Sequence, residues 1–252
     1  MSNSITTGIF GAFMGLLTAI AGVLWSLQYY AIDSMHQSAV TLQNLVFIFG
    51  ELELFIGSIQ NIMLGNAMSS FAFLTIIFVL FALLTLILMG IGLYGIGKIE
   101  GKAMGTVSLV IGIIGAVLAL ILILAGAVAG GTTHTWTSIW MISELPGLLG
   151  SAPLWVIFLV LNIVPGVPTV GVAYLWLGLV VLGITLIIFG ITFIMMRETL
   201  ASPGLSVATG VLAIIAGIFL FAGPIAPWLA FIVFFVASIM AALIFFQARE
   251  MA

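Results

Sequence analysis

Six runs of apolar residues, each long enough to cross a lipid bilayer as a helix, dominate this chain. A helix needs about 20 apolar residues to cover about 30 Å of hydrocarbon. Backbone groups cannot stay unpaired in lipid, and the alternating pattern of a membrane barrel is missing. The sequence therefore predicts an all-α polytopic membrane bundle, built as one transmembrane domain, with spans at about 8–31, 70–97, 103–130, 170–196, 204–222 and 224–246.

The composition supports a lipid environment and excludes several classes of protein. Hydrophobic residues make up 64% of the 252 residues and charged residues only 4%, whereas a soluble domain is about one quarter charged. The net charge is −3 without a basic cluster, which argues against a nucleic-acid partner. The chain has no cysteine, so disulfides, thiolate metal sites and cysteine nucleophiles are excluded.

Charge and tryptophan indicate one orientation in the membrane. Threading the six spans through a bilayer brings all the basic residues to one side: Lys98, Lys102, Arg197 and Arg249. The same threading places both histidines and all the tryptophans on the other side: Trp25, Trp136, Trp140, Trp155, Trp176 and Trp228. Basic residues accumulate on the cytoplasmic face and tryptophan prefers the interface. We therefore expect a multi-pass protein of the cell membrane with both termini in the cytoplasm.

This topology leaves two long connections outside, at about 32–69 and 131–169. Within the first, residues 40–64 are apolar apart from a polar stripe at seven-residue intervals, Asn44, Glu51 and Ser58. We expect an interfacial helix there; a further span is the alternative. Within the second, residues 152–164 are too short to span and fit a helix in the outer leaflet. The two segments would form a cap.

Two parts of the sequence resemble each other. Residues 84–91 (LTLILMGI) align with 184–191 (ITLIIFGI), and 110–115 (VIGIIG) align with 211–216 (VLAIIA). Both pairs of segments flank a short basic turn, which suggests duplication of a helix hairpin over 70–130 and 170–222. The alternative is that apolar spans rich in leucine, isoleucine and glycine resemble one another by composition alone.

Small residues one helical turn apart indicate close helix packing. Where lipid removes the hydrophobic force between helices, such residues let two backbones approach. The pairs are Gly11 and Gly15, Gly126 and Gly130, and Ala213 and Gly217. We expect packing within the chain, with an interface to another subunit or a second copy as the alternative.

Side chains of the kind that bind metals gather in the outer connections: Asp33, His36, His134 and Glu144. Two imidazoles with carboxylates could bind a metal ion or ligate a haem. No pair of histidines has helical ligand spacing, so solvated loop residues are the alternative reading. No other cofactor is expected.

Glu51 and Glu53 are the candidates for a proton or ion pathway, because an ionisable residue near the membrane is a functional hypothesis by default. No Lys or Arg lies within a span to pair with either carboxylate, which weakens this hypothesis. The sequence shows no set of residues that resembles a catalytic site.

The final third of the chain resembles the HdeD-like acid-resistance membrane proteins. The resemblance rests on residues 177–183 (LGLVVLG), 210–221 (GVLAIIAGIFLF), Gly223-Pro224 and the closing Gln247-Ala248-Arg249. It implies a six-helix architecture built from repeated hairpins, a stress-related role and no catalytic residues. The long outer segments 32–69 and 131–169 depart from that family.

These observations favour a non-enzymatic structural or accessory subunit of an energy-transducing or stress-related membrane assembly. Its partners would be other membrane subunits or further copies of the chain. The alternatives are a transporter or ion conductor that uses Glu51, and a metal or haem subunit that uses His36 and His134.

Overall fold

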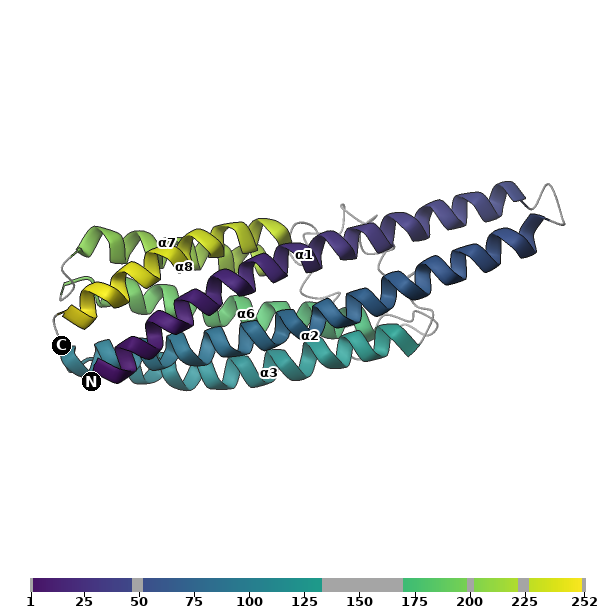
Figure 1. Ribbon diagram of the computed structural model, residues 1–252. Helices are drawn as coiled ribbons and strands as arrows, with labels where there is room; N and C mark the ends of the chain where they lie inside the picture. The colour runs from purple at the N-terminus through teal and green to yellow at the C-terminus, as the bar shows by residue number, and fades with distance from the viewer. Residues whose placement is uncertain (1, 47–51, 133–169, 199–201, 222–226, 251–252) are drawn as a thin grey trace.

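The described part of the chain is helical apart from short turns. The computed structural model describes residues 2–46, 52–132, 170–198, 202–221 and 227–250, and within them there are six helices and no strand (Figure 1). The helices are α1 (Ser2–Val46), α2 (Leu52–Glu100), α3 (Met104–Thr132), α6 (Val170–Met195), α7 (Pro203–Phe221) and α8 (Pro227–Glu250). The prediction of an all-α bundle is confirmed.

Each of the six helices contains a segment long and apolar enough to cross a membrane. These segments are Asn3–Gln28, Phe73–Ile99, Met104–Ala125, Trp176–Met195, Pro203–Phe221 and Trp228–Glu250. Large apolar side chains point away from the bundle on every helix, and Phe10 and Phe73 are 62% and 64% exposed. An apolar surface on all sides requires lipid around it. The chain is therefore a multi-pass integral membrane protein.

The six helices form a closed ring in which each packs against two neighbours. The order around the ring is α1, α2, α3, α6, α7 and α8, and α8 returns to α1. One short turn, at residues 101–103, joins α2 to α3. Helices α8 and α1 also lie side by side, although they stand at opposite ends of the sequence (Figure 1). The ring thus consists of three antiparallel pairs, α2 with α3, α6 with α7, and α8 with α1.

Two of these pairs use corresponding residues. Six buried positions of α2 each have a buried counterpart one hundred residues later: 79, 82, 86, 89, 93 and 96 in α2 correspond to 179, 182, 186, 189 and 193 in α6 and to 196 just after it. A Cβ placed on Gly105 of α3 would lie 2.7 Å from the carbonyl oxygen of Leu93. At the corresponding place in the other pair, Ser206 of α7 donates a hydrogen bond to the carbonyl oxygen of Phe193. The aligned segments therefore pack alike, and their origin by duplication stays a prediction.

Local sequence explains the helix ends on the basic side of the bundle. Helix α2 ends before Gly101, whose φ of 67° is left-handed, and the amide of Lys102 donates to the carbonyl of Gly97. This is the glycine-dependent Schellman cap. Helix α7 begins at Pro203, which lacks a donor and suits the first helical position. The carbonyl of Ser202 accepts the amides of Leu205 and Ser206.

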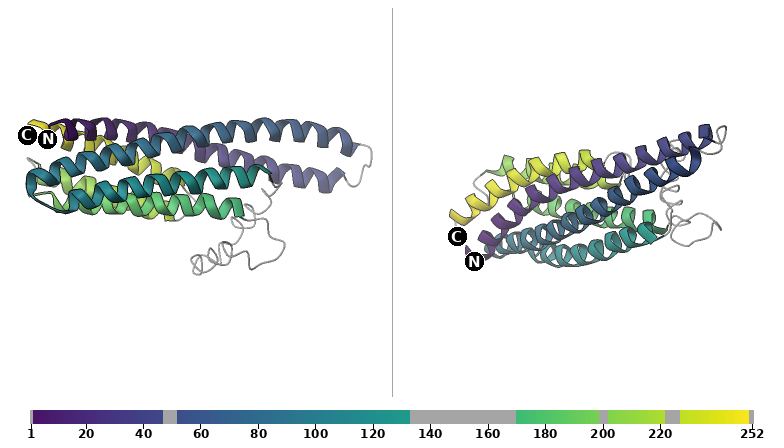
Figure 2. Two further views of the ribbon diagram at one scale, coloured as in Figure 1. Left: turned by 90° about the horizontal axis from the view of Figure 1, so that it is seen from below. Right: turned by 45° about the vertical axis from the view of Figure 1, so that its right-hand side comes forward.

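Helices α1 and α2 are much longer than their spans, which corrects one prediction. Helix α1 continues from residue 29 to 46, and α2 begins at residue 52, well before its span at Phe73. The two run side by side and extend past the other helices (Figures 1 and 2). The single helix expected over 40–64 is therefore wrong, because the chain reverses direction between Val46 and Leu52. We call residues 29–46 and 52–72 the arm.

The two ends of the bundle differ as the sequence suggested. Both chain termini and the turn between α2 and α3 lie at the end opposite the arm (Figure 1), and so do all the basic residues: Lys98, Lys102, Arg197 and Arg249. Trp25, Trp176 and Trp228 lie at the span ends toward the arm. Trp136, Trp140, Trp155 and the segment 152–164 lie outside the described residues.

Candidate functional site

The polar residues buried inside the described bundle are neutral. All buried polar residues are threonine or serine. The hydroxyls of Thr18 and Thr85 lie 2.7 Å apart and link α1 to α2. Those of Ser108 and Thr192 lie 2.6 Å apart and link α3 to α6. Such pairs satisfy polar groups where water is absent and hold neighbouring helices together.

Aromatic rings fill the bundle interior toward the arm. Trp25 is buried, and its indole nitrogen donates to the hydroxyl of Thr75 at 2.9 Å. Its ring stacks on Phe78 with a centroid separation of 5.6 Å, and Phe78 meets Phe231 edge to face at 5.2 Å. Trp25 thus joins α1 to α2 from inside, and Phe78 continues this aromatic cluster to α8.

One small cavity lies between the helices beside these rings. Its lining comes from five helices and includes Thr18, Phe78, Leu186, Leu220 and Phe234. Its volume is about 20 Å³, which is close to the minimum that one water molecule requires. An apolar cavity of this size offers no room for a substrate.

Charged groups of the described bundle lie at its basic end instead. The ammonium of Lys102 donates to the carbonyl oxygen of Met195 at 2.7 Å, and so caps the end of α6 from the neighbouring hairpin. The ammonium of Lys98 lies 5.3 Å from the ring centroid of Tyr94. No ionisable residue is buried among the residues whose side chains are described.

The arm is the feature that distinguishes this bundle from a plain set of spans. At 1.5 Å per residue, the α1 portion extends about 27 Å beyond Gln28, and the α2 portion is about 31 Å long. Its helices contain two carboxylates, Asp33 and Glu53, one histidine, His36, and no Lys or Arg. Sequence analysis missed the arm. The stretch from Tyr29 to Phe49 has neither glycine nor proline, and this indicated that the first helix could continue past its span.

The predicted ligand residues that the structure describes are spread along the arm. Asp33 and His36 lie one turn apart on α1. Glu53 lies at the start of α2, beside the end of α1 (Figure 1), and is therefore about 15 Å along the arm from His36. Within the described residues, no three His, Asp or Glu side chains are grouped as a metal site. Glu51, His134 and Glu144 lie outside the described residues.

The predicted packing residues contact several different helices. A Cβ on Gly15 would lie 2.5 Å from the hydroxyl oxygen of Ser238 in α8, whereas one on Gly11 would lie 2.5 Å from the backbone nitrogen of Met89 in α2. Gly217 lies against Gly183 of α6, with a Cβ only 2.6 Å from that carbonyl oxygen. Ala213 is buried in α7, and Gly126 and Gly130 belong to α3.

Comparison with known proteins adds no family to this description. The chain matches no protein-family model, no curated protein and no solved structure. The protein is a membrane bundle of six described helices with a protruding helical arm. This class follows from its own sequence and structure.

Proposed function

We propose that this protein is a non-enzymatic accessory subunit of a membrane assembly, in which the bundle is the anchor and the arm binds a partner subunit. The observation that carries the proposal is the combination of the arm's length with its lack of charge. An exposed helical pair in water normally has charged residues at about a quarter of its positions. The arm has only two carboxylates, Asp33 and Glu53, and one histidine, His36.

A charge-poor arm that stands clear of the lipid needs another surface to cover it. Its axis follows the bundle axis (Figures 1 and 2), so its far end cannot lie in the same bilayer as the spans. A long helical pair with so few charged residues is poorly suited to stand alone in water, and protein association is the usual way to cover such a surface. A partner protein is the cover that fits this geometry.

The described interior supports an anchoring role over a conducting one. Its buried polar residues are threonine and serine, and its axis is filled by Phe78, Phe231 and Phe234 around a cavity of about 20 Å³. Ion transfer through Glu51 and a metal or haem bound by His36 and His134 stay predictions. The stress-related role that the HdeD-like resemblance implies stays a prediction too.

The test is purification from native membranes in a mild detergent, followed by native mass spectrometry of the intact assembly and a metal and visible-absorbance scan. We expect a stoichiometric partner. The arm is then replaced by a short glycine-serine turn between Gln28 and Phe73, which lie on adjacent helices. This variant should keep its six spans and lose the partner.

A second variant tests whether the partner binds the surface of the arm or only requires its length. It replaces residues 29–46 and 52–72 with a helical hairpin of equal length rich in glutamate and lysine. Loss of the partner in this variant supports binding by the arm surface. Retention of the partner in both variants would assign binding to the bundle, and a lone monomer from native membranes would remove the proposal.

A further inference from the structure

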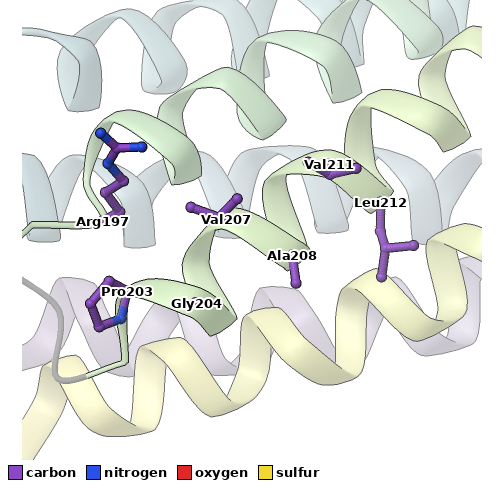
Figure 3. Close-up of a pocket in the computed structure, with 7 residues that line it drawn as sticks. All are labelled: Arg197, Pro203, Gly204, Val207, Ala208, Val211 and Leu212. Atoms are coloured by element: carbon purple, nitrogen blue, oxygen red, sulfur yellow. The ribbon is translucent and has the colours of Figure 1, made fainter.

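An open groove runs along α7 at the basic end of the bundle. Its volume is about 730 Å³. Arg197 stands at one end, just after α6, and residues of α7 between Pro203 and Leu212 form its wall (Figure 3). The wall is apolar, with Val207, Ala208 and Val211 along one stretch of the helix. Arg197 is thus the single charged residue of the lining.

The position of the groove matches the depth profile of one lipid leaflet. The span of α6 ends at Met195 and the span of α7 begins at Pro203, so Arg197 lies just beyond the spans, at the level of lipid headgroups. Val207 and Val211 lie within the span of α7, at the level of acyl chains. From Pro203 to Leu212 the helix rises about 14 Å, which is about half the hydrocarbon thickness.

The charge at this end of the groove favours an anion. The Arg197 side chain is exposed, and its planar guanidinium suits bidentate contact with a phosphate group. The ammonium of Lys102 reaches the end of α6 through its bond to the carbonyl oxygen of Met195. Two positive side chains therefore flank the last turn of α6, and of these Arg197 lines the groove.

Gly204 leaves space in the groove. A Cβ added to this residue would meet no heavy atom within 4 Å, unlike the Cβ on Gly210 further along α7, which would lie 2.5 Å from the carbonyl oxygen of Gly190. A large side chain at residue 204 would therefore enter the groove without displacing a neighbouring helix.

We propose that this groove is a binding site for an anionic phospholipid. The guanidinium of Arg197 pairs with the headgroup phosphate, and one acyl chain lies along Val207, Ala208 and Val211. The site is separate from the arm and does not depend on the function proposed for it.

Native mass spectrometry of the full chain tests this site. The purified protein is titrated with phosphatidylglycerol or with phosphatidylcholine of the same acyl chains, and retained lipid is counted. We expect phosphatidylglycerol to bind more tightly, and Arg197→Gln and Gly204→Leu each to weaken it about fivefold. Arg197→Lys keeps the charge but loses the bidentate geometry, so it should weaken binding less than Arg197→Gln does.

Two matched variants serve as controls. Arg249→Gln removes a charge from the same end of the bundle but outside the groove, and Ala103→Leu adds bulk at the exposed residue of α3's turn that corresponds to Gly204. Both should bind phosphatidylglycerol as the unaltered chain does. If Arg249→Gln weakened phosphatidylglycerol binding as much as Arg197→Gln, the lipid would be attracted by the general surface charge and not by a site. Equal binding of phosphatidylcholine, no effect of Gly204→Leu, or equally effective competition by inorganic phosphate would also overturn the proposal.

Discussion

Replacing Gly8 by alanine tests the ring directly, because Gly8 stands where α1 meets both α2 and α8. A Cβ at this position would lie 2.7 Å from the Cα of Gly92 and 2.8 Å from the ring of Phe245. Ordinary contact begins at 3.4 Å, so the helices must separate by about 0.7 Å, which forfeits a quarter to a half of each affected dispersion contact. The Cα of Gly92 is a backbone atom and cannot rotate away as a side chain can.

We expect this overpacking to cost about 3 kcal/mol, offset by about 1 kcal/mol from the higher helix propensity of alanine. The net loss is about 2 kcal/mol in the free energy of unfolding, a change of about 30-fold in the unfolding equilibrium constant. Reversible unfolding in mild detergent titrated with dodecyl sulfate, followed by far-UV circular dichroism, measures this quantity.

Gly204→Ala is the matched control, because the same methyl group there enters open space. It should be neutral or stabilise the protein by up to about 1 kcal/mol. An unchanged free energy of unfolding in Gly8→Ala would refute the close approach of α1 to α2 and α8. Equal destabilisation in the two variants would refute it as well, since the loss would then follow from glycine itself and not from its neighbours.

Three further substitutions probe single contacts by thermal or dodecyl sulfate unfolding. Gly101→Ala should cost about 1–2 kcal/mol from backbone strain alone, because φ is 67° and no atom crowds the new Cβ; equal stability would contradict the left-handed cap. Ser238→Ala should stabilise the protein by about 1 kcal/mol, since its buried hydroxyl has no hydrogen-bond partner; a loss of stability would mean that the hydroxyl is satisfied. A double-mutant cycle of Thr18→Val and Thr85→Val should give a coupling of about 1 kcal/mol for their 2.7 Å contact, and zero coupling would remove that contact.

The six spans were predictable because hydropathy summed over about 20 residues exceeds any local preference. The arm was not, because its apolar stretch at 40–64 has the hydropathy of a single helix and does not indicate that one helix ends and another begins within it. The seven-residue spacing of Asn44, Glu51 and Ser58 was misleading for the same stretch. It assumes one continuous helix, but Asn44 belongs to α1 and Ser58 to α2. The first proline of the chain is Pro146, and its late position was the better guide to two long helices.

The small residues show a different limit of sequence reasoning. Gly11 and Gly15 form the familiar pair one turn apart, which suggests a single partner helix. Gly11 lies against α2, whereas Gly15 lies chiefly against α8. The spacing indicates that backbones approach, but the identity of the partner depends on how six helices close around one axis. The candidate site was harder still, since the arm and the groove near Arg197 both arise from that assembly.

The closure of the ring has a consequence for the order in which the protein can be made. Helix α1 is the first of the six to be synthesised and α8 the last, yet the two pack against each other. Until α8 has entered the membrane, the small residues on one side of α1, among them Gly15 and Gly22, have no helix to receive them. An unfinished chain therefore presents an open seam within the bilayer. An insertion factor or a neighbouring subunit that shields membrane helices during biogenesis would find its target at this seam, and would be released when α8 takes its place.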